Sequence, residues 1–172
     1  MQRVDLKQVD ALLMVYLNQG DVTEALSLLE KFKIAFEEAG EVSSYLFWLV
    51  QALIANSQFK EAEEIAKTVS GPNRPVLIAV ALEGIAKNLG NWQPLVDHLQ
   101  EWYRSTGDGK VLLELCHELA LREEWEQLVA YSGELMAKIG TVDALRLAVK
   151  GYYKTNKAQA CLDLLVRYST IC

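Results

Sequence analysis

Hydrophobic residues recur at spacings of three and four along nearly the whole chain, and no segment alternates in the way of a β-strand. Short polar stretches interrupt this pattern at regular intervals. The pattern therefore predicts ten amphipathic helices, joined as five helix–turn–helix pairs. The predicted pairs cover residues about 5–18 and 21–38, 43–56 and 58–69, 75–88 and 91–105, 109–121 and 124–138, and 141–155 and 157–170.

The polar interruptions contain residues that commonly begin and end helices. We expect Asp21, Ser57 and Asn91 to be N-caps, and Glu24 follows Asp21 by three residues, as in a capping box. Glycines lie between the pairs, where a left-handed backbone conformation ends a helix at low cost. These glycines are Gly40, Gly71, Gly107 and Gly140.

The predicted pairs repeat at an almost constant interval. Phe59, Trp92, Trp125 and Ala158 follow one another at intervals of 33 residues, and Val22 precedes Phe59 by 37. Each of these residues opens the second helix of its pair. A period of this length is typical of stacked helical pairs, which bury their apolar faces against their neighbours. We therefore expect Trp92 and Trp125 to lie in the core, beneath the preceding helix.

Within this period the sequence resembles the tetratricopeptide repeats, in which a large residue opens the second helix and a small residue follows one turn later. The family's small residue in the first helix and its proline at the end of the second helix are missing. The pairs that fit are Val22/Ala25, Phe59/Ala62 and Ala158/Cys161, and the pairs that depart are Trp92/Leu95 and Trp125/Leu128.

The resemblance implies an all-α fold, namely a right-handed α-α superhelix of about five repeats in a single domain over residues 1–172. The repeats would cover about 5–38, 43–69, 75–105, 109–138 and 141–170. It also implies a non-catalytic scaffold or adaptor that binds a peptide or protein segment on its concave face. Two alternatives stay open, namely a regulatory sensor domain that binds a small effector and a self-assembly module.

Composition and charge narrow the partners. The chain has 172 residues, a net charge of −6 and a pI of about 5.0, which argues against general nucleic-acid binding. The charge is uneven, because residues 141–172 hold five Lys/Arg and two Asp/Glu, whereas residues 1–140 hold 12 and 21. Three cysteines without a Cys-x-x-Cys motif favour a reducing, cytoplasmic location. No stretch has the length and apolarity of a signal peptide or a membrane span, so we expect no membrane partner.

Candidate catalytic chemistry is sparse. His98 and His117 belong to different predicted helices, and the neighbours Cys116 and His117 point about 100° apart on a helix, which prevents them from acting as nucleophile and base. No Cys/His spacing suits a metal ion. Gly107–Lys110 lacks the strand and the Gly-Lys-Ser/Thr ending of a phosphate loop. We therefore expect no enzyme activity, cofactor or metal.

Two surfaces are candidates for partner binding. The predicted first helices near residues 45–50 and 76–82 are apolar on every side, so they are either packed between neighbouring repeats or line a hydrophobic groove. The residues expected to line that groove are Phe47, Gln51, Val80 and Gly84.

The second candidate surface is a basic stripe, which could bind an acidic peptide, a C-terminal carboxylate or a phosphate group. Its lysines and arginine could instead be solvated, or could pair with the acidic repeats of another copy. The stripe comprises Arg146, Lys150 and Lys154 at four-residue spacing, together with Lys110, His117 and Tyr153.

The last predicted helix still carries an apolar stripe, formed by Leu162, Leu165, Val166 and Ile171. Helical-repeat stacks normally end in a helix with a polar outer face. We therefore expect either that the chain is a segment of a longer protein or that this helix pairs with another molecule, which would make a homo-oligomer.

Overall fold

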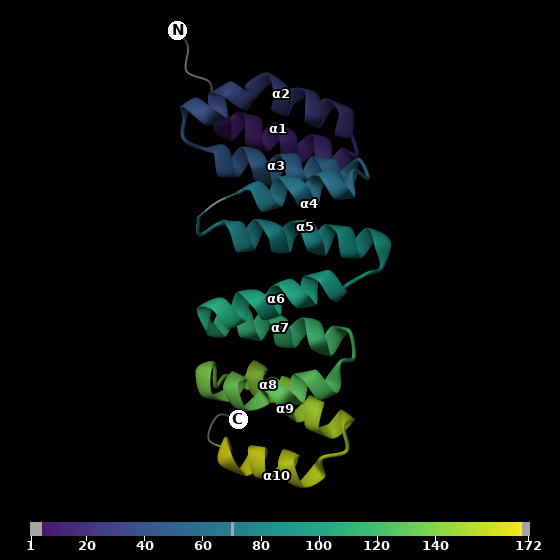
Figure 1. Ribbon diagram of the computed structural model, residues 1–172, viewed down its shortest axis with the longest axis vertical. Coiled ribbons are helices and arrows are strands. Elements are labelled where there is room, and N and C mark those ends of the chain that lie inside the picture. The colour runs from purple at the N-terminus through teal and green to yellow at the C-terminus, as the bar shows by residue number, and fades with distance from the viewer. Residues whose placement is uncertain (1–4, 70, 170–172) are drawn as a thin grey trace. The chain divides into compact units, whose positions relative to one another are not determined.

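The computed structural model describes residues 5–69 and 71–169, and this part of the chain contains ten α-helices and no strand (Figure 1). The ten predicted helices are confirmed, and their ends agree within three residues. No helix in the described ranges combines the length and apolarity needed to cross a bilayer. The chain forms two compact units, residues 1–91 and 92–172, and each is described by itself.

The first unit contains α1 to α5. Consecutive helices pack against each other, and α3 also contacts both α1 and α5, so the first helices of successive pairs are neighbours. The core forms where the apolar stripes of these helices meet, with Leu13, Leu29 and Phe36 almost fully buried. The helices are α1 (Leu6–Gln19), α2 (Val22–Glu38), α3 (Val42–Ala55), α4 (Phe59–Thr68) and α5 (Arg74–Leu89).

Specific side chains fix how α3 contacts its two neighbours. Trp48 Nε1 of α3 donates a hydrogen bond to Asp10 Oδ1 of α1 at 2.8 Å. On the other side, a Cβ atom added at Gly84 of α5 would lie 2.8 Å from Ile54 Cδ1 of α3. The missing side chain at Gly84 therefore permits the close approach of α5 to α3.

The second unit contains α6 to α10. Consecutive contacts again join α6 to α7, α7 to α8, α8 to α9 and α9 to α10, and α7 also contacts α9. Buried Gly151 of α9 lies against Leu128 of α8, whose Cδ2 would be 3.3 Å from an added Cβ. Ser132 Oγ and the Tyr152 hydroxyl are hydrogen-bonded at 2.8 Å beside this contact. The helices are α6 (Gln93–Thr106), α7 (Gly109–Leu121), α8 (Trp125–Lys138), α9 (Val142–Lys154) and α10 (Ala158–Arg167).

The turn inside every helix pair has one residue with a positive φ, and these residues share one position in the repeat. They are Gly20, Ser57, Gly90, Glu123 and Asn156, with φ of 80°, 61°, 72°, 59° and 58°. Two of the predicted N-caps are wrong. Ser57 adopts the left-handed conformation while Gln58 takes the N-cap position, and Trp92 takes the N-cap position expected of Asn91. Asp21 is at the N-cap position, but its side chain makes no capping hydrogen bond there.

The prediction that Trp92 and Trp125 are core residues is wrong, because both side chains are only half-buried. Each ring is covered by cationic side chains. The Arg122 guanidinium carbon lies 3.4 Å from the centroid of the Trp92 ring. Lys150 Nζ and Lys154 Nζ lie 5.4 and 5.9 Å from the centroid of the Trp125 ring. The tryptophans therefore lie at the edge of the helical pairs, where basic stems pack on their faces.

Candidate functional site

An open groove of about 670 Å³ lies between α9 and α10 in the second unit. Its surface is almost entirely apolar, and Arg146 and Lys150 are the charged residues among those that line it. We call it the α9–α10 groove. Its lining residues are Val142, Leu145, Arg146, Val149, Lys150, Tyr153, Cys161 and Leu165.

The groove is apolar because several of its residues occupy repeat positions that are buried in the preceding helix pair. Cys116 of α7 and Leu128 and Ser132 of α8 are buried in the region where α9 packs onto α7 and α8. The residues 33 positions later are Val149, Cys161 and Leu165, which are half-buried or exposed. The α9–α10 groove is therefore the same repeat face that α9 covers one pair earlier.

The groove brings together part of the predicted basic stripe. Arg146, Lys150 and Tyr153 line it, and the Tyr153 side chain is 73% exposed. Lys154 lies outside the lining, near the Trp125 ring.

The other two members of the stripe lie on α7. Lys110 is exposed in the first turn of α7, where its backbone N–H donates to Asp108 Oδ1 at 2.9 Å. His117 Nε2 is 2.9 Å from Asp143 Oδ2, which links α7 to α9. Three of the six residues therefore line the α9–α10 groove, and the other three, Lys110, His117 and Lys154, lie outside its lining. Helical spacing found the members on α9, but the contribution of α10 depends on how the two helices pack.

The apolar stripe predicted on the last helix is exposed where it is described. Leu162, Leu165 and Val166 have exposed fractions of 55%, 39% and 68%. Leu165 alone of these three lines the α9–α10 groove. Ile171 lies outside the described residues.

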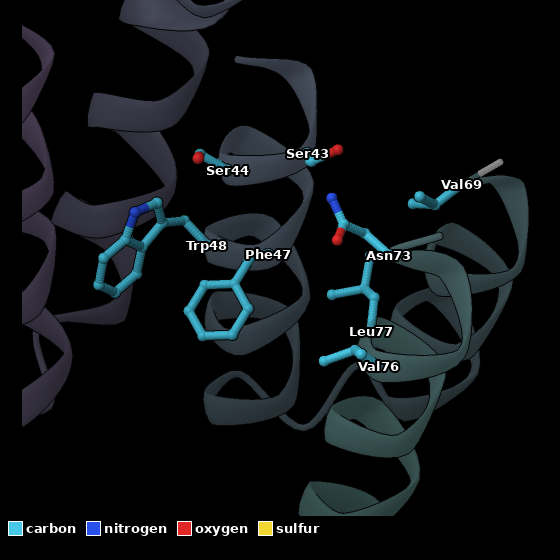
Figure 2. Close-up of a pocket in the computed structure, with 8 residues that line it drawn as sticks. All are labelled: Ser43, Ser44, Phe47, Trp48, Val69, Asn73, Val76 and Leu77. Carbon is cyan, nitrogen blue, oxygen red and sulfur yellow. The ribbon is translucent and has the colours of Figure 1, made fainter. Parts of the chain in front are cut away.

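A smaller cavity of about 230 Å³ lies in the first unit, between the start of α3 and the start of α5. Figure 2 shows Phe47 of α3 on one side and Val76 and Leu77 of α5 on the other. Phe47 is 38% exposed. The lining also includes Trp48, Val69 and Asn73, which helical spacing does not predict as groove residues.

The other three residues of the predicted hydrophobic groove lie outside this cavity. Gln51 and Val80 are half-buried, and Gly84 lies against Ile54. Gly84 therefore belongs to the contact between α3 and α5. Phe47 is the member that lines the open cavity, which we call the Phe47 cavity.

Cys116 of α7 was the candidate nucleophile. Cys116 is fully buried, and burial together with the charge of Glu134 raises the pKa of its thiol to about 12. The thiol is therefore protonated and unreactive near neutral pH. Within residues 5–69 and 71–169, no group of three or more His, Cys, Asp or Glu side chains is placed to hold a metal ion.

Comparison with protein-family models, with curated proteins and with solved structures found no match to this chain.

Proposed function

We propose that this chain is a non-catalytic protein-interaction module of the tetratricopeptide-like α-solenoid type, which binds an amphipathic helix of a protein partner in the α9–α10 groove. One observation carries the proposal. The groove is open, whereas the same repeat face of α7 and α8 is covered by α9. A helix is therefore the shape of ligand that this face accepts within the protein itself.

The chemistry of the groove defines the helix that fits it. Leu145, Val149 and Leu165 offer an aliphatic floor, which favours leucine-like anchors at i, i+4 and i+7 of the ligand. Arg146 and Lys150 favour carboxylates beside that stripe, because charge-assisted hydrogen bonds form where basic and acidic groups meet. The preferred ligand is therefore an acidic amphipathic helix.

The alternative of a sensor for a small effector has less support. Such a site is usually an enclosed pocket with a few converging polar groups. The α9–α10 groove and the Phe47 cavity are both open to solvent, and both are lined chiefly by apolar side chains. We propose a cytoplasmic location, which agrees with the free thiols of Cys116 and Cys161.

The test uses a synthetic helical peptide with leucines at i, i+4 and i+7 flanked by glutamates, and a scrambled peptide of the same composition. We expect the first peptide to bind and the scrambled one to fail. Leu165→Glu should weaken binding at least tenfold, or about 1.4 kcal/mol. The new carboxylate would lie among the apolar side chains of the groove and would repel the glutamates of the peptide. Fluorescence anisotropy measures both affinities.

Val166→Glu is the matched control, because Val166 is also an exposed aliphatic residue of α10 but does not line the groove. It should leave the affinity unchanged. Equal binding of the two peptides, or equal loss in the two variants, would contradict the proposal.

A further inference from the structure

The first helix of the chain exposes apolar residues on its outer face. Leu12 and Val15 of α1 have exposed fractions of 39% and 46%, although both are aliphatic. Helix α1 is also the first helix of its pair, as α9 is in the last pair. Its exposed face can therefore be compared with the face that α9 buries.

The repeat register makes this comparison residue by residue. Tyr16 and Tyr152 both stand six residues before the residue that opens the second helix of their pair. Helix α9 buries five residues, and one of them, Leu145, lines the α9–α10 groove and has the buried counterpart Val9 in α1. The other four are Ala144, Leu147, Ala148 and Gly151, and their counterparts in α1 are Gln8, Ala11, Leu12 and Val15.

All four of these counterparts in α1 are exposed. Helix α1 thus presents the face by which α9 docks onto α7 and α8. The α9–α10 groove presents the face that receives such a helix. The two halves of one internal interface are both open, at different places in the same chain.

Charge favours contact between these two regions of different copies. Residues 5–41 hold three Lys/Arg and eight Asp/Glu, a net charge of −5. Residues 141–169 hold five Lys/Arg and two Asp/Glu, a net charge of +3. Opposite net charges speed the encounter of two surfaces and disfavour the contact of like ends.

We propose that α1 of a second copy occupies the α9–α10 groove, so that the chain associates head to tail. This inference rests on the proposed function, because it names a helix that the groove accepts. Helix α1 itself is neutral, since its charged residues are Lys7 and Asp10, and the other seven acidic residues of 5–41 lie outside it. The apolar face of α1 therefore makes the contact, and the acidic residues around it favour the encounter. The interface is heterologous, since one copy contributes α1 and the other contributes α9 and α10. Such an interface produces open chains or closed rings.

One position in this interface is unfavourable. Within the protein, His117 pairs with Asp143 across α7 and α9. The counterparts of these residues are Lys150 of the groove and Lys7 of the incoming α1, two like charges. Lys7→Glu should therefore tighten the association about two- to fivefold, which is the effect of an exposed ion pair.

Sedimentation velocity of the full chain over a range of concentrations tests the proposal. We expect wild type to form dimers and larger species as its concentration rises. Leu165→Glu blocks the groove and Val15→Glu blocks α1, so each variant alone should be monomeric. An equimolar mixture should form a dimer and nothing larger, because each variant retains the half that the other lacks.

The matched controls are Val166→Glu and Ile34→Glu, which change exposed aliphatic residues whose repeat counterparts Gly133 and Ala137 are also exposed. Both controls should associate as wild type does. A monomeric wild type at all concentrations, or two monomeric variants that form no mixed dimer, would overturn the inference.

The proposed function is judged separately by the synthetic acidic helix. Val15→Glu keeps an intact groove and should bind that peptide, whereas Leu165→Glu should not. If wild type is monomeric but binds the peptide through Leu165, the groove function stands and only the self-association fails.

Discussion

Glu123 adopts the left-handed backbone conformation that Gly90 adopts one repeat earlier, with φ of 59° and 72°. Both residues lie in the turn between the two helices of a pair. The turn requires this conformation whatever residue is present. For residues with a Cβ atom it costs about 1–2 kcal/mol, because the Cβ approaches a carbonyl oxygen.

Glu123→Gly should therefore stabilise the protein by about 0.5–1 kcal/mol, after the entropy that glycine gains in the unfolded chain is subtracted. Urea unfolding followed by circular dichroism measures the change. Glu123→Ala is the control, since it removes the side chain but keeps Cβ. If the alanine variant were as stable as the glycine variant, the backbone would not be the cause.

Gly84→Ala should destabilise the first unit by up to about 2 kcal/mol, because overpacking costs about 1–3 kcal/mol and the higher helix propensity of alanine offsets about 1 kcal/mol of this. The physical cause is the added Cβ, which would lie 2.8 Å from Ile54 Cδ1. Ile54→Val removes that atom. The double variant should therefore lose less stability than the sum of the two single losses, as measured in a double-mutant cycle.

Gly133→Ala is a suitable control for this cycle, because a Cβ at Gly133 meets no atom within 4 Å. It should be neutral or stabilising. Strict additivity of Gly84→Ala and Ile54→Val would show that the two residues do not constrain each other.

Trp125→Ala should lower the free energy of unfolding by about 2 kcal/mol, less than the 3–5 kcal/mol of a core aromatic residue, because the ring is half-buried. Leu128→Ala, at a fully buried position of the same helix, should cost about 2–5 kcal/mol. Thermal and urea unfolding of both variants give the order. A larger loss for Trp125→Ala would place the tryptophan in the core.

Stability should fall as the pH rises from about 9 towards 12. The pKa of Cys116 is raised from 9.0 to about 12, so the unfolded thiol loses its proton first. The unfolded state then binds fewer protons than the folded state, and the free energy of unfolding decreases with pH. Burial raises the pKa of Tyr45 and Tyr103 as well, which acts in the same direction above pH 10.

Urea unfolding at pH 8, 9 and 10 measures this effect, and Cys116→Ala should show a smaller decrease over the same interval. Thiol labelling at pH 8 is an independent check. Half-buried Cys161 should react, and Cys116 should react only after unfolding. Rapid labelling of Cys116 in the folded protein would contradict its burial.

The sequence by itself determined the ten helices and the regular positions of the turns that separate them. These properties are local, since apolar spacing defines a helical face and polar breaks end it. The same spacing placed Arg146, Lys150 and Lys154 on one face of α9, with Tyr153 beside them. The α9–α10 groove contains Arg146, Lys150 and Tyr153, whereas Lys154 lies outside its lining. The right-handed superhelix of the tetratricopeptide type stays a prediction.

Tertiary structure decided what lies opposite each helical face. Leu165 and Cys161 line the groove because α10 packs on α9. Helical spacing predicts Gly84 as a groove residue, but Ile54 lies against it. Ser57 was predicted to cap a helix, because a polar residue suits both an N-cap and a left-handed turn. The choice between the two depends on the angle at which the paired helices meet, and a single helix does not specify that angle.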